Sequence, residues 1–104
     1  MPNGADFRNF DLSGSNLSFA RLKYSNFSET RLKHSILKNS RLKKSNFKSA
    51  WLWNADIEGA DFGQSDLTDA KLAYRIDDDI IKNWEKADLK NIVWDRNKPP
   101  TAGW

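Results

Sequence analysis

An apolar residue recurs at every fifth position from Phe7 to Leu72, and this spacing constrains the fold more than any other feature. Two residues before each such position the chain carries Ala, Ser or Thr, with Phe10 as the one exception. On an α-helix, five residues leave an angular offset of about 140°, so no apolar stripe forms. On a flat strand, an odd period places successive apolar residues on opposite faces. The recurring positions are Phe7, Leu12, Leu17, Leu22, Phe27, Leu32, Leu37, Leu42, Phe47, Leu52, Ile57, Phe62, Leu67 and Leu72.

A period of five is compatible with a chain that turns one corner in every repeat. The apolar residue and the small residue two places before it then share one face of a short extended segment. If that face points inward each time, the apolar side chains stack into a column, and the small residues let the walls approach closely. The pattern therefore predicts an all-β solenoid, whose inward Ser and Thr residues need hydrogen-bond partners.

Length and composition narrow the class of protein. The chain has 104 residues, enough for one domain, and no cysteine, which excludes disulfides and thiolate metal sites. No apolar run approaches the roughly 20 residues of a membrane span. The start MPNGADFRNF lacks the apolar core of a signal peptide. We therefore expect a soluble, cytoplasmic protein without a membrane span.

The runs GADF, GSNL, NADI, QSDL and DAKL resemble the A-(D/N)-L-x-x motif of the pentapeptide-repeat family, and the resemblance covers residues 3–74. It implies the family's right-handed quadrilateral β-helix, with four pentapeptides in each coil and about three and a half coils here. SNF recurs at a spacing of twenty, from Ser25 to Ser45, in agreement with such a coil. RLK recurs at a spacing of ten, which also fits other coil lengths, so the four-sided shape follows from the resemblance.

A C-terminal cap is expected over residues 75–104. The pattern of Ile80, Ile81, Trp84 and Ala87 predicts a short helix near 78–87, and the preceding aspartates suit a helix start. Segment 89–94 predicts a final strand, and segment 98–104 predicts an irregular tail.

The amino end shows no comparable lid. Phe10 stands where the other repeats carry a small residue, so we expect it to plug the open core. Otherwise a second chain covers this edge, and a homodimer through either end of the solenoid is a further hypothesis.

Charge is unevenly distributed along the chain. Residues 21–48 hold nine Lys and Arg against Glu29 alone, whereas residues 54–79 hold eight acids against two basic residues. In a twenty-residue coil, Arg21 lies beneath Arg41 and Lys23 lies beneath Lys43. Such a basic face either binds an anionic partner or only maintains solubility.

Two tryptophans flank the inward Leu52, so both are expected to point outward. In the same register, Trp51 and Trp53 lie above Arg31 and Lys33, within reach of cation–π contacts. An exposed tryptophan pair indicates an interface, unless the C-terminal tail folds back over it.

Catalytic and metal sites find little support in the sequence. His34 is the only histidine, and we interpret it as a solvated side chain on the basic face. The carboxylates of Asp77, Asp78 and Asp79 suit Mg²⁺ or Ca²⁺, but helix capping explains them with fewer assumptions. We therefore expect no enzyme, no catalytic residue, no metal and no cofactor.

The sequence favours a non-enzymatic binding or scaffold module that presents a rigid surface to a macromolecule. A protein partner is expected first, and nucleic acid or another polyanion is the alternative on the basic face. The remaining hypotheses are an enzyme and a structural fragment without a partner. The candidate binding residues are Arg21, Lys23, Arg31, Lys33, Arg41, Lys43, Trp51 and Trp53.

The alternative function is that of a DNA mimic that regulates DNA gyrase or another topoisomerase, as the resemblance implies for some members of the family. Such mimicry needs an acidic surface, whereas the middle of this chain is basic and the rod is short. The residues that fit it are Asp56, Glu58, Asp61, Asp66 and Asp69.

Overall fold

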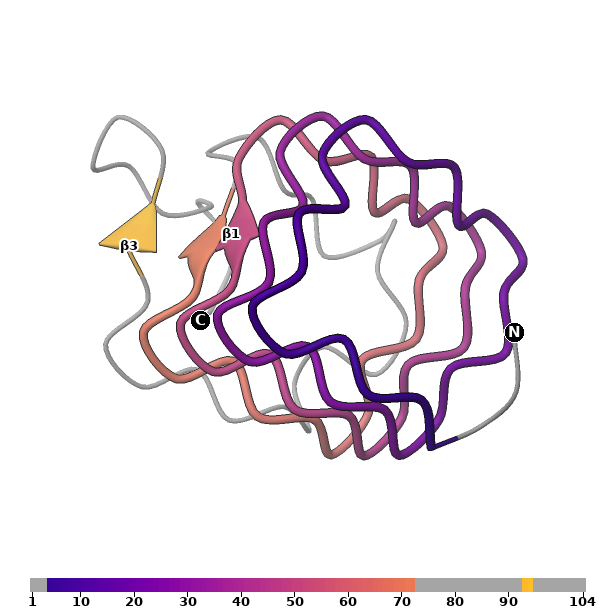
Figure 1. Cartoon of the computed structure of the whole chain (residues 1–104). Helices are drawn as coiled ribbons and strands as arrows, with labels where there is room; N and C mark the ends of the chain where they lie inside the picture. The colour runs from indigo at the N-terminus through magenta and orange to yellow at the C-terminus, as the bar shows by residue number, and fades with distance from the viewer. Residues whose placement is uncertain (1–3, 73–92, 95–104) are drawn as a thin grey trace.

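The structure is a computed structural model that describes residues 4–72 and 93–94. The chain winds into stacked four-sided coils around one axis (Figure 1). Parallel backbone bridges join residues twenty apart, such as Asp6 with Asn26 and Arg21 with Arg41. The solenoid and the twenty-residue register are therefore confirmed.

Three two-residue strands form one parallel sheet on one side of the stack. They are β1 (Trp51–Leu52), β2 (Lys71–Leu72) and β3 (Val93–Trp94), in the order β1-β2-β3. β3 pairs with β2 inside the segment for which the sequence predicts a strand. The predicted helix near 78–87 and the predicted tail at 98–104 lie outside the described residues.

Each pentapeptide contributes a straight segment and a corner. The apolar Leu22 donates its N–H to the Arg41 carbonyl of the next coil at 2.8 Å, and Arg41 donates to the Ala20 carbonyl at 2.9 Å. The corner is a β-turn, closed by the bond from the Ser25 N–H to the Leu22 carbonyl at 3.2 Å. Hydrogen bonds between coils and within corners therefore satisfy the backbone as the chain winds.

Asp or Asn before the apolar residue caps the corner that follows. Asn46 Oδ1 accepts the Lys48 N–H at 2.9 Å, and Asp11 Oδ1 accepts the Ser13 N–H at 3.1 Å. Hydrogen bonds from Ser13 also lower the pKa of Asp11. This local bond is a physical reason for the Asp/Asn preference at this position. The same cap forms at Asp6, Asn16, Asn26, Asp56, Asp61 and Asp66.

The core consists of the recurring apolar side chains. Phe27 stacks on Phe7 with ring centroids 5.0 Å apart and on Phe47 at 4.7 Å, and Leu67 is buried in the same register. This column is confirmed. Phe10 touches the Phe7 ring edge-on at 5.8 Å and remains 53% exposed, so it covers this end of the core only in part.

Buried hydroxyls pair with backbone carbonyls of the coils. Thr30 Oγ1 donates to the Phe7 carbonyl at 2.7 Å, and Ser45 Oγ donates to the Leu22 carbonyl at 2.7 Å. Ser45 Oγ also accepts the Ser25 N–H at 3.3 Å. The described residues offer Ser25 Oγ no partner, although this hydroxyl is equally buried.

Two alanine substitutions in this serine column test the assignment. Ser45→Ala should lower the free energy of unfolding by about 1 kcal/mol because two hydrogen bonds are lost. Ser25→Ala removes an unsatisfied hydroxyl and should leave stability unchanged or raise it. Urea unfolding followed by circular dichroism measures both. An equal loss in the two variants would contradict the assignment.

The second corner residue of each repeat has a positive φ. The values lie near +60° for Phe19, Tyr24, Asn54 and Gln64 alike. This left-handed conformation suits Gly and Asn and strains other side chains. Several corners of this chain therefore carry residues that local stability does not favour.

A reciprocal exchange of amides tests this strain. Gln64→Asn should raise the free energy of unfolding by about 0.5 kcal/mol, and Asn54→Gln should lower it by a similar amount. Both sites are exposed and have a positive φ, and the charge is unchanged. Shifts of the same sign in thermal unfolding would contradict the explanation.

Candidate functional site

The candidate binding residues divide between two opposite sides of the solenoid. Residues ten apart lie half a coil apart, because a four-sided coil takes twenty residues. One side carries Arg21, Lys23, Arg41 and Lys43, and the opposite side carries Arg31, Lys33, Trp51 and Trp53. The structure does not bring the two groups together, in agreement with the register expected of a twenty-residue coil.

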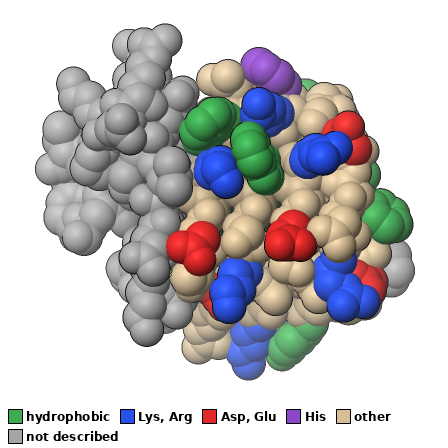
Figure 2. Space-filling view, turned by 60° about the vertical axis from the view of Figure 1, so that its left-hand side comes forward, with side chains coloured by type: hydrophobic (Ala, Val, Ile, Leu, Met, Phe, Trp, Pro, Cys, Tyr) green, Lys and Arg blue, Asp and Glu red, His purple; other side chains and the backbone are tan. Residues whose placement is uncertain are grey.

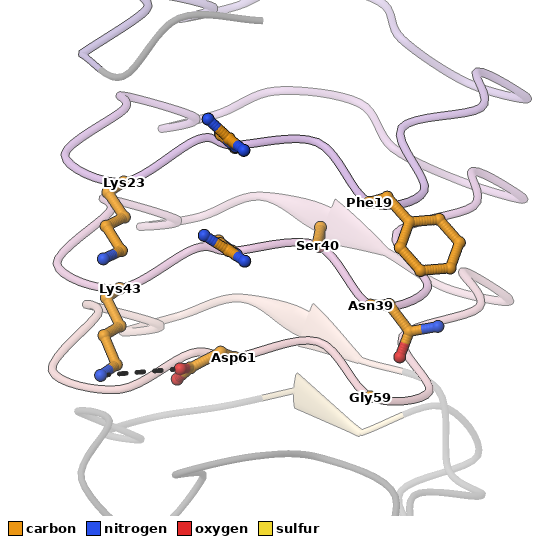
Figure 3. A pocket seen from close by; sticks show the side chains of 9 residues that line it. Phe19, Lys23, Asn39, Ser40, Lys43, Gly59 and Asp61 are labelled. Carbon is orange, nitrogen blue, oxygen red and sulfur yellow. Dashed lines mark ion pairs between the residues drawn. The ribbon is translucent and has the colours of Figure 1, made fainter.

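The first group lines a hollow of about 610 Å³, which we name the arginine groove. In Figure 3, Lys23 and Lys43 lie along one edge, and Phe19, Asn39 and Gly59 lie along the other. Between these edges, backbone bridges join successive coils, from Arg21 to Arg41 and from Arg41 to Asp61. The groove is thus one whole side of the solenoid, from corner to corner. The lining residues are Phe19, Arg21, Lys23, Asn39, Ser40, Arg41, Lys43, Gly59 and Asp61.

Positive charge dominates the arginine groove. Among the described lining residues, Asp61 is the one carboxylate, and Asp61 Oδ2 lies 3.8 Å from Lys43 Nζ. Asp61 Oδ1 also accepts the Gly63 N–H at 3.0 Å, so this residue caps its own corner. The lysine is half-exposed, and an exposed pair of this length contributes little energy. The end of the groove that holds Arg21 and Lys23 is therefore the more cationic end.

The edge opposite the lysines was missed by sequence reasoning. Phe19 is 71% exposed, and it occupies a corner with φ of +61°. The Asn39 amide lies against Gly59 of the next coil. A Cβ at Gly59 would collide with this amide, so glycine at this position leaves room for it. The signal was a large aromatic residue at an outward corner position, where only Gly and Asn are favoured.

The opposite side carries a tryptophan cluster, made of Arg31, Lys33, Trp51, Trp53 and Lys71. The two indole rings meet edge-on at 6.0 Å. Lys33 Nζ lies 5.2 Å from the Trp51 ring and 5.6 Å from the Trp53 ring, and Lys71 Nζ lies 4.0 Å from Trp51. Lys71 was also missed, although it follows Trp51 by one coil.

The tryptophans of this cluster are half-buried, so the pair is less exposed than its outward position suggested. Lysine ammonium groups lie over the rings, and the rings pack on each other. Figure 2 shows hydrophobic side chains interleaved with Lys and Arg on the side that carries β1. The cluster thus has intramolecular partners for its aromatic faces.

The described residues offer few side chains suited to catalysis or metal binding. His34 is exposed, and residues 4–72 contain no group of three side chains that could hold a metal ion. Asp77, Asp78 and Asp79 lie outside the described residues. Over the same part of the chain, no helix has the length and apolarity needed to cross a bilayer.

A substitution at Lys33 tests the cation–π contacts of the tryptophan cluster. Lys33→Gln should lower the free energy of unfolding by about 0.5–1 kcal/mol because Trp53 loses the cation over its ring and Trp51 keeps only Lys71. Lys38→Gln is the matched control, since Lys38 is half-buried at the same corner position and is outside the cluster. Equal effects of the two changes in urea unfolding would contradict a specific contribution from the rings.

Solved structures support the same architecture. A pentapeptide repeat protein from the Arabidopsis thaliana thylakoid lumen superposes with a TM-score of 0.66 at 24% identity, over 86% of this chain and 61% of that one. HetL, a pentapeptide repeat protein involved in heterocyst differentiation regulation in the cyanobacterium Nostoc, has a TM-score of 0.56 at 28% identity. That match covers 69% of this chain and 32% of HetL. The chain therefore spans less than two thirds of either protein.

A weaker structural match is QnrB1, a plasmid-mediated fluoroquinolone resistance protein, with a TM-score of 0.38 at 16% identity over 86% of this chain and 60% of that one. No curated protein matches the chain significantly. The family model for pentapeptide repeats matches residues 3–39, 25–64 and 45–74. The chain therefore belongs to the pentapeptide-repeat family.

Proposed function

We propose that the chain is a non-enzymatic binding module whose arginine groove binds an anionic macromolecule. The observation that carries this proposal is the parallel backbone bridge that places Arg21 and Arg41 in register on successive coils, with Lys23 and Lys43 along one edge of the same groove. A cationic row of this kind matches the repeated negative charges of a polyanion.

The cationic row has a structural cost. Neighbouring strands lie about 4.8 Å apart, and like charges that face each other across them repel. Arg also carries no hydrogen-bond acceptor, so Arg21 and Arg41 cannot form the side-chain cap that Asp and Asn supply at this position. A bound anion would offset the repulsion, and guanidinium groups suit phosphate and carboxylate oxygens.

The solenoid also lowers the cost of binding. Backbone bonds hold the coil of Arg21 to the coil of Arg41, so the cations need little ordering when a partner arrives. Repeat proteins commonly present their binding residues on regular surfaces of this kind.

The tryptophan cluster is a weaker candidate for the binding surface. Both of its indoles are half-buried, and its lysines already contact the rings. It is better explained as intramolecular packing, with Lys33 and Lys71 covering the aromatic faces. A protein partner is therefore expected to contact this module through acidic groups at the arginine groove, in the same way as another polyanion.

DNA mimicry, the alternative function, is less favoured by the geometry. It needs a continuous acidic surface, but Asp56, Asp61 and Asp66 follow one another at intervals of five and so lie on three successive sides of the coil. Each of the three also accepts a backbone N–H at its own corner. Corner capping accounts for these carboxylates without a gyrase partner.

Titration of the full chain with fluorescently labelled inorganic polyphosphate tests the proposal. We expect binding that weakens as salt increases, because phosphate contacts release counterions. The double variant Arg21→Ser and Lys23→Ser should lose about tenfold or more in affinity, since the loss of even one contact to a charged group costs about 1.5–3 kcal/mol.

The matched control is Arg31→Ser with Lys48→Ser, which removes the same charges from the same repeat positions outside the groove. Its affinity should fall by less than about threefold, because only screened, distant charge is lost. No binding at low salt, or equal losses in the two double variants, would show that the groove has no specific role.

A further inference from the structure

We propose that the arginine groove takes single-stranded nucleic acid, with phosphates on Arg21, Lys23 and Arg41 and a base stacked on Phe19. This inference rests on the proposed function and names its ligand class. Protein modules for single strands combine a positive groove with aromatic side chains on which bases stack. The arginine groove contains both elements.

Phe19 is an aromatic surface without a partner among the described residues. It is 71% exposed, whereas Phe10 is 53% exposed and packs against Phe7. Tyr24 is 61% exposed, and Lys44 Nζ lies 5.5 Å from its ring centroid. The ring of Phe19 makes no aromatic or cation–π contact within residues 4–72, and no core role explains it.

Local stability does not explain Phe19 either. It stands at φ of +61°, where successive coils of the same edge carry Asn39 and Gly59, the residue types that this conformation favours. A large aromatic ring is thus held outward, in a strained conformation, beside a row of cations. Strained and exposed residues of this kind are candidates for a binding role.

The spacing within one coil suits a nucleotide. Phe19, Arg21 and Lys23 are alternate residues of one coil, and two residues of extended chain span about 6–7 Å. An aromatic surface therefore lies next to a cation at roughly the scale that separates a base from its own phosphate. Arg41, one coil further, provides a second cation for the neighbouring phosphate.

A single strand fits these observations better than a duplex. The faces of paired bases are buried in the stack, so a protein ring reaches a base face only where the base is unstacked. One side of a short solenoid also offers no helix or ribbon to enter a duplex groove. An acidic protein would engage the cations but would not need Phe19.

The test measures binding of the full chain to labelled oligo-dT, a matched DNA duplex and inorganic polyphosphate, with polyglutamate as competitor. Phe19→Asn removes the ring and keeps a residue that tolerates the positive φ, so the variant is expected to fold. It should lower the affinity for oligo-dT about tenfold and leave polyphosphate binding within about twofold. Phe19→Trp should restore oligo-dT binding.

Each other outcome is decisive. If polyphosphate binds and Phe19→Asn changes oligo-dT affinity no more than polyphosphate affinity, the single-strand inference is overturned and the proposed function stands. Tighter binding of the duplex, or displacement of oligo-dT by polyglutamate at equal charge concentration, also overturns the inference. A lack of binding to all three probes at low salt overturns the proposed function as well.

Discussion

Hydrogen bonding between one coil and the next, in a register of twenty residues, is the constraint on which the rest of this structure depends. Each straight segment donates to the coil on one side and accepts from the coil on the other, as Leu22 and Arg41 illustrate. The register stacks Phe7, Phe27 and Phe47 into one column and places the small residues where the walls meet. It also decides which outward side chains become neighbours.

Outward side chains are not needed for the core. An outward residue that differs from the type its backbone position favours is therefore informative. Asp or Asn before the apolar residue caps the following corner, and Gly or Asn suits the positive φ of that corner. Arg21 and Arg41 give up the first preference, and Phe19 gives up the second. Similar departures occur on the opposite side, at Arg31, Trp51 and His34, but the arginine groove combines cations on successive coils with an exposed aromatic ring, which makes it the strongest candidate for function.

Much of the fold could be predicted from the sequence, because a period of five with small residues two places earlier has few physical solutions. The inward column and the stacking of Arg21 on Arg41 followed from that pattern and the family coil length. The candidate site was harder to predict. Residues ten apart look alike in the sequence, as in the RLK runs, yet they lie on opposite sides of the coil.

Side-chain contacts explain the remaining differences. The half-burial of Trp51 depends on where flexible Lys33 and Lys71 place their ammonium groups, which spacing alone does not specify. The capping by Asp61 depends on corner geometry, so its carboxylate looked available for another role. Phe19 was overlooked because the repeat pattern marks it only as outward, without showing that it faces a cationic groove.

The central claim is that the arginine groove, and not the opposite side, receives the anionic partner. The most direct measurement is a titration of the ¹⁵N-labelled full chain with inorganic polyphosphate, followed by amide chemical shifts. The account predicts that the largest shift changes fall in residues 19–23 and 39–43. Largest changes in residues 31–33 and 51–53, or changes spread evenly around the coils, would contradict it.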